Sequence, residues 1–130
     1  MAKFKISERY NSFKYAAKGI FTMILSQHNA WIHALITVLA VIAGFCFGLT
    51  KPEWCWIILA IITVWTAETL NTAFEFLLDV ASPEFHPLAE KAKNVAAGAV
   101  LISAIGAMLI GLLIFSPHII KALQFKRHFY

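Results

Sequence analysis

Two long apolar stretches without a charged side chain constrain the fold of this 130-residue sequence more than any other feature. Residues 32–49 include one histidine but no Asp, Glu, Lys or Arg, and residues 95–116 carry no charge at all. A helix needs about 20 mainly apolar residues to cross the roughly 30 Å hydrocarbon core of a bilayer. Because 60% of the residues are hydrophobic, the composition also favours a membrane protein over a soluble domain.

A third apolar stretch, residues 54–78, is as long as the other two but contains Glu68 and Glu75. A charged group at the bilayer centre costs about 2.5–3.5 kcal/mol on insertion scales, so two carboxylates in one helix must face protein, water or metal. The sequence therefore predicts three membrane-spanning helices, of which the middle one carries polar groups for a reason. Pro52, in the short link between the first two spans, favours a tight antiparallel hairpin.

Two further segments complete the expected layout. Residues 7–29 have apolar side chains at a helical period and lysines on another face, which predicts an amphipathic helix on the membrane surface. Residues 79–94 form the sizeable polar loop between spans, and Ser82 followed by Pro83 suits the start of a helix. The whole chain, 1–130, is thus expected to be one all-α membrane domain.

The basic residues predict orientation rather than a nucleic-acid partner. The net charge is +4, but most of the cations flank the spans, where anionic lipid headgroups or nucleotide phosphates are the nearer partners. More of them lie on the side of the surface helix and the polar loop than on the other side, so that side is expected to face the cytoplasm. Cys46 and Cys55 lack the CxxC spacing of a redox or metal site and are expected to pack as small apolar residues.

The chemistry is expected on one face of the second span. Glu68, Asn71 and Glu75 are spaced i, i+3 and i+7, and Asp79 continues the same face, so these four residues form a polar stripe. Phosphoryl transfer needs carboxylates for a divalent cation, a base for the attacking hydroxyl and cations for phosphate charge. Alternatively, the stripe only joins helices of an oligomer through hydrogen bonds. The adjoining loop supplies the donors and cations His86, Lys91 and Lys93.

At these residues the sequence resembles a known family. The stretch 67–101, AETLNTAFEFLLDVASPEFHPLAEKAKNVAAGAVL, is similar to the signature of the prokaryotic diacylglycerol kinase and undecaprenol kinase family, above all in E-x-x-N-x-x-x-E-x-x-x-D followed by H and A-K. The segments NSFKYAAKGI and HNAWIH are also similar, so the resemblance covers nearly the whole chain. In agreement with a fold unrelated to soluble kinases, the sequence has neither a GxxxxGK(S/T) loop nor the HRD and DFG motifs.

The resemblance implies a homotrimer in a bacterial inner membrane, with active sites at the cytoplasmic boundary. The sites would transfer the γ-phosphate of ATP, with Mg²⁺ as cofactor, to the hydroxyl of diacylglycerol or undecaprenol. Glu68 would be the base that takes the hydroxyl proton, Asn71 would orient the hydroxyl, and Glu75 would hold Mg²⁺. Ala97, which is small, would let the lipid approach closely. The resemblance assigns nucleotide contacts to Tyr15, Gln27, Glu75, Glu84, His86, Lys93 and Asn94.

Two positions depart from the family pattern. Gln27 stands where the family usually has a metal-binding Glu, and Asn94 stands where it usually has Asp. An amide oxygen of Gln27 can still join Glu75 as a ligand of Mg²⁺, but it adds no negative charge for a cation that favours carboxylates. We therefore expect an active but weakened kinase. The alternative is a catalytically silent relative that acts as an oligomeric membrane protein.

Overall fold

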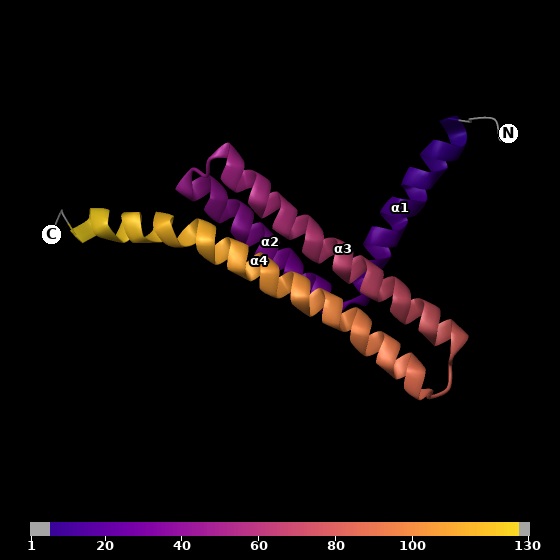
Figure 1. The fold of residues 1–130 in the computed structure, drawn as a ribbon. Helices are drawn as coiled ribbons and strands as arrows, with labels where there is room; N and C mark the ends of the chain where they lie inside the picture. Colours follow the sequence, from indigo (N-terminus) through magenta and orange to yellow (C-terminus); the bar gives the residue numbers. More distant parts are fainter. Residues whose placement is uncertain (1–5, 128–130) are drawn as a thin grey trace.

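The computed structural model describes residues 6–127, which form helices and no strand. In chain order the elements are α1 (Ile6–Ser26), α2 (His28–Phe47), α3 (Lys51–Ala81) and α4 (Pro87–Arg127). Figure 1 shows α2, α3 and α4 running side by side, while α1 leaves them at a steep angle. Helices α2, α3 and the part of α4 up to Phe125 are long and apolar enough to cross a membrane, which confirms the predicted all-α membrane fold with three spans.

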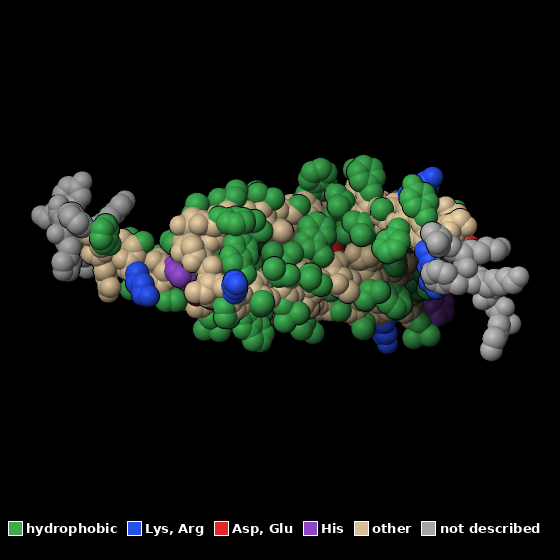
Figure 2. All heavy atoms as spheres, turned by 90° about the horizontal axis from the view of Figure 1, so that it is seen from above, with side chains coloured by type: hydrophobic (Ala, Val, Ile, Leu, Met, Phe, Trp, Pro, Cys, Tyr) green, Lys and Arg blue, Asp and Glu red, His purple; other side chains and the backbone are tan. Residues whose placement is uncertain are grey.

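The surface of the helical body is arranged as expected for a membrane-spanning protein. In the face that Figure 2 presents, hydrophobic side chains cover the middle, and most of the cationic side chains lie toward the two ends. Large apolar residues such as Leu39, Phe45 and Leu113 are more than half exposed. These side chains would be costly in water but are compatible with a hydrocarbon environment.

The main packing seam runs between α3 and α4, and α2 packs against α3. On α3 the buried side chains Ile57, Ala60 and Val64 follow a helical period. Glu68 and Asn71 continue that row toward the end of the helix and are buried as well. The polar stripe therefore begins on the face of α3 that packs inside the protein rather than on a face turned to lipid.

The link between α2 and α3 is as tight as Pro52 suggested. Gly48 ends α2 with a left-handed backbone (φ 66°), a conformation that glycine adopts without a steric penalty. The backbone N–H of Leu49 bonds the carbonyl of Gly44 at 3.0 Å. At the start of α3, the Glu53 carboxylate accepts hydrogen bonds from the backbone N–H and the hydroxyl of Thr50, each at 2.7 Å. Both helix ends at the hairpin are thus satisfied internally.

A break at Gln27 separates the first helix from the first span. Gln27 has an extended backbone (φ −110°, ψ 121°), so α1 ends at Ser26, three residues before the predicted boundary at residue 29. Most of α1 is exposed, and Met23 is its buried anchor against the rest of the protein. That α1 lies on the membrane surface stays a prediction.

The polar segment 79–94 is helical at both ends. α3 continues to Ala81 and α4 starts at Pro87, which leaves residues 82–86 as the connection. The prediction of a helix start at Ser82 is therefore wrong: its hydroxyl bonds the carbonyl of Glu84 within the turn. Instead, His86 Nδ1 accepts the N–H of Leu88 at 3.2 Å, and Pro87 takes the first helical position, where its missing N–H has no consequence.

The last helix is longer than the third predicted span. α4 does not end near Pro117 but runs through it to Arg127. A proline inside a helix frees one carbonyl, and membrane helices tolerate this where neighbouring groups compensate. Figure 1 shows the carboxyl-terminal part of α4 extending beyond the α2–α3 hairpin. Where the membrane boundary crosses these helices stays a prediction.

We expect Gly44→Ala to destabilise the hairpin. A Cβ atom at Gly44 would lie 2.7 Å from Cη2 of Trp54 and 3.2 Å from a methyl group of Leu49, so the side chains would have to shift. Overpacking of this kind costs about 1–3 kcal/mol of unfolding free energy, measurable as a lower melting temperature in detergent. Gly106→Ala is the control, since its Cβ would meet nothing within 4 Å, and equal melting temperatures for the two variants would contradict the assigned packing.

Candidate active site

A pocket of about 230 Å³ between the three spans gathers several of the residues expected to carry the chemistry. We refer to it as the central pocket. It brings Glu68 and Asn71 of α3 next to Ala97 of α4, and the roles assigned to these residues stay predictions. The remaining lining residues are Asn29, Ile32, His33, Val100, Leu101 and Ala104.

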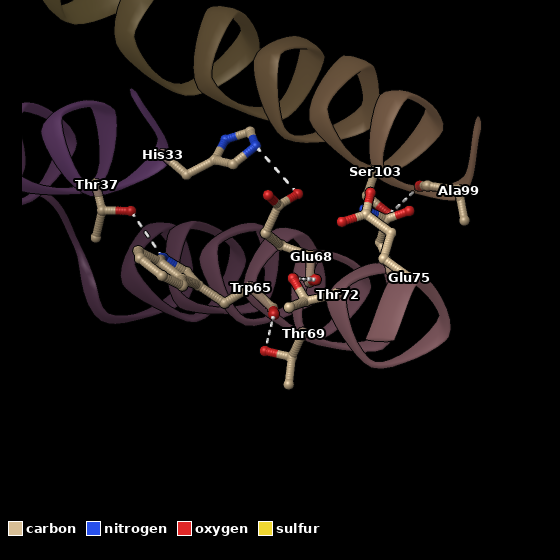
Figure 3. A network of polar contacts seen from close by, with 10 residues as sticks. His33, Thr37, Trp65, Glu68, Thr69, Thr72, Glu75, Ala99 and Ser103 are labelled. Carbon is tan, nitrogen blue, oxygen red and sulfur yellow. Dashed lines mark hydrogen bonds and ion pairs between the residues drawn. The ribbon is translucent and has the colours of Figure 1, made fainter. Parts of the chain in front are cut away.

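Glu68 has the most unusual environment in this pocket. Its side chain is 1% exposed, and neither carboxylate oxygen has a hydrogen-bond partner among the described residues. The imidazole of His33 lies near it, with Nε2 3.9 Å from Oε2, as Figure 3 shows. Burial of an ionised carboxylate without hydrogen bonds is unfavourable by several kcal/mol. A group kept in this state is ready to accept a proton or a hydrogen bond from a ligand.

Glu75 lies about one turn beyond Asn71 on the same face of α3, and two amide side chains hold its carboxylate by hydrogen bonds. Gln27 Nε2 donates to its Oε2 at 2.6 Å, and Asn71 Nδ2 donates to its Oε1 at 3.0 Å. The Gln27 bond ties the break between α1 and α2 to the polar stripe. Asn71 lies between the two glutamates, and its own Oδ1 is buried without a partner among the described residues.

The amides and the carboxylate of this cluster fit a magnesium ion that is bound together with substrate phosphates better than one that the protein holds alone. Within residues 6–127 no group of three His, Cys, Asp or Glu side chains could hold a metal ion. Glu75, the Gln27 oxygen and the unpartnered Asn71 Oδ1 offer one negative charge and two neutral oxygens. Mg²⁺ is commonly bound in this way, by one or two carboxylates together with substrate phosphates and water.

A second, open pocket of about 550 Å³ lies at the α3–α4 connection. This loop pocket brings together Glu84, His86 and Lys93, three of the predicted nucleotide contacts. Lys93 Nζ bonds Asp79 Oδ1 at 2.5 Å, which joins the end of the polar stripe to α4. The Lys93 ammonium and the His86 imidazole, which both line the loop pocket, are accessible to an anionic ligand.

Four of the seven predicted nucleotide residues lie outside both pockets. Gln27 and Glu75 bond each other in the polar cluster. Tyr15 is 70% exposed on α1, and Asn94 is exposed on α4. Within one chain the predicted set is thus divided among the loop pocket, the Gln27–Glu75 cluster and these two positions.

Sequence reasoning missed His33 as a site residue. Its five-residue separation from His28 places the two histidines on different faces of a helix, which argues against a shared metal site. The signal was its place as the lone histidine inside an otherwise uncharged span, since ionisable residues at such depths usually serve a function.

Comparison with known proteins decides the family. The sequence model of the prokaryotic diacylglycerol kinase family matches residues 14–115, which include the break at Gln27, the polar stripe and the loop pocket. The chain belongs to this family. The expected enzyme class, a lipid kinase, is thereby confirmed.

Individual relatives of this diacylglycerol kinase family member carry two different substrate names. The undecaprenol kinase of Bacillus subtilis is 38% identical over 113 residues, which cover 87% of this chain and 92% of the relative. The diacylglycerol kinase of Synechocystis is 36% identical over 101 residues, or 77% of this chain and 58% of the relative. A diacylglycerol kinase of Helicobacter pylori is 32% identical over 112 residues, or 81% and 88% of the two chains.

We expect Glu68→Gln to stabilise the folded protein. The substitution removes a buried charge that has no hydrogen bond and should raise the unfolding free energy by about 1–3 kcal/mol. Glu75→Gln is the matched control and should lower the unfolding free energy, because it disturbs the two amide hydrogen bonds to this carboxylate. Thermal unfolding in detergent measures both. A lower melting temperature for Glu68→Gln would show that the charge is better compensated than its contacts indicate.

Proposed function

We propose that this kinase transfers the γ-phosphate of ATP to the hydroxyl of a membrane lipid alcohol, at the cytoplasmic face of a bacterial inner membrane. The observation that carries the proposal is Glu68, a buried carboxylate without a hydrogen bond in a pocket between three spans. A base placed there can meet a hydroxyl that arrives from the lipid phase.

The proposed reaction gives each of these side chains a role. Glu68 accepts the proton of the lipid hydroxyl while the hydroxyl oxygen forms a bond to the γ-phosphorus. The bond between that phosphorus and the β–γ bridging oxygen breaks, and ADP leaves with the electron pair. Asn71 orients the hydroxyl beside Glu68 and, through its 3.0 Å bond, fixes Glu75 at the same time. The small side chain of Ala97 leaves room for the lipid at the pocket.

Glu75 and the amide oxygen of Gln27 would hold Mg²⁺ with the nucleotide. When bound, the ion supplies positive charge against the phosphate oxygens. The loop pocket adds the Lys93 ammonium and the His86 imidazole for the nucleotide, with Glu84 beside them. Tyr15 and Asn94 are proposed as further nucleotide contacts. The proposed homotrimer would have to bring these separate groups to one nucleotide.

The acceptor is proposed to be either diacylglycerol or undecaprenol, because relatives bear both names. The central pocket, at about 230 Å³, holds the hydroxyl-bearing end of a lipid rather than its chains. The chains would lie along the apolar outer surface of the helices, which Figure 2 shows on one face. Either lipid is compatible with this arrangement.

A second candidate is a catalytically silent relative that acts as an oligomeric membrane protein. The amides at Gln27 and Asn94 favour it, since the family usually has carboxylates at both positions. In this case the stripe would serve helix association alone.

Labelled phosphate transfer tests the two candidates. With γ-labelled Mg-ATP and either diacylglycerol or undecaprenol in mixed micelles, we expect one lipid to be labelled by the parent protein. Glu68→Gln should reduce transfer by roughly 100-fold or more, as for the loss of a general base. Glu53→Gln, the same change in the first turn of α3 and outside the central pocket, should retain activity. A folded parent protein that labels neither lipid would favour the silent relative.

Gln27→Glu tests the magnesium assignment. The change places two carboxylates where a 2.6 Å hydrogen bond now lies, so the variant should be less stable than the parent in EDTA and regain stability with Mg²⁺. We expect the half-saturating Mg²⁺ concentration for activity to fall roughly tenfold, equal to ~1.4 kcal/mol. Asn94→Asp makes the same change of charge away from Glu75 and should not show the loss in EDTA. Equal Mg²⁺ dependence of Gln27→Glu and parent would remove Gln27 from the metal site.

A further inference from the structure

His33 occupies a position that the proposed reaction does not yet use. Its side chain projects from α2 into the central pocket and is 15% exposed. Figure 3 shows the imidazole turned toward the Glu68 carboxylate, with Nε2 and Oε2 3.9 Å apart. This distance is too long for a direct hydrogen bond but short enough for an electrostatic effect on a carboxylate that is 1% exposed.

No Lys or Arg is among the residues that line the central pocket beside Glu68. Its second titratable neighbour is Glu75, which lies on the same helix and is acidic. The lining residues of α4 are Ala97, Val100, Leu101 and Ala104, all uncharged, and α2 adds Asn29 and Ile32 besides His33. Residues of α1 do not line this pocket. Among the lining residues, compensation of the Glu68 charge therefore falls to His33.

We propose that His33 is a positioning residue, which keeps the Glu68 carboxylate ionised and directed into the central pocket. The inference rests on the proposed function of Glu68 as the base. Only the ionised carboxylate can take the proton of the lipid hydroxyl. A protonated imidazole beside it offsets part of the cost of burying that charge, whereas burial next to Glu75 alone would favour the neutral acid. His33 itself exchanges no proton with the substrate in this role.

Steady-state kinetics of His33→Gln test the proposal. We expect kcat for the lipid to fall about tenfold at neutral pH, with the KM for Mg-ATP within about twofold of the parent, because ground-state nucleotide binding is not altered. His28→Gln is the matched control, since His28 is an exposed histidine of the same helix. A parent-like kcat for His33→Gln at neutral pH would overturn the proposal.

A double-mutant cycle on thermal stability gives a readout that does not depend on activity. His33→Gln should lower the melting temperature of the parent but leave that of Glu68→Gln nearly unchanged, because the charge to be compensated is then gone. If His33→Gln alone fails to fold, recovery of folding by Glu68→Gln supports the same coupling. Equal losses in both backgrounds would overturn it. An inactive parent protein that still shows the coupling would confirm the contact between His33 and Glu68 but remove the proposed kinase function, and with it the positioning role.

Discussion

The burial of Glu68 in the seam between α3 and α4 is the constraint on which the rest of the site depends. The row Ile57, Ala60 and Val64 packs as an apolar seam, and the carboxylate continues it without a change of face. The seam thus provides a protein-lined position for a carboxylate whose exposure to lipid would be energetically costly. The cost of this position is offset elsewhere, by the long apolar helices that hold the bundle in the membrane.

Two pockets in different parts of the fold divide the proposed work. The central pocket is the smaller and lies between three spans, whereas the loop pocket lies at the α3–α4 connection and carries more charged side chains. Asn71, Glu75 and Asp79 form the connection, because they follow one another along the same helix from one region to the other. A phosphate donor that is soluble in water and an acceptor that is soluble in lipid could meet only along such a line.

The sequence was sufficient for the features that depend on one helix at a time. Apolar length predicted the three spans, and helical spacing placed Glu68, Asn71 and Glu75 together. It failed at the start of α4, since both Pro83 and Pro87 suit a first helical position and only packing of the turn selects the second. It also missed His33, because the approach of this histidine to Glu68 arises from contact between two helices and has no spacing along the chain.

The hydrogen bond between Gln27 and Glu75 has a mechanical consequence. Gln27 is the residue at which the chain turns from α1 into the first span, and its side chain bonds the Glu75 carboxylate. The direction of α1 is therefore coupled to the position of this carboxylate. The tilt of α1 and the geometry of Glu75 cannot change independently while this bond persists. If α1 rests on the bilayer, local thickness and headgroup charge would act as inputs to the site, and the enzyme would sense the membrane whose lipids it modifies.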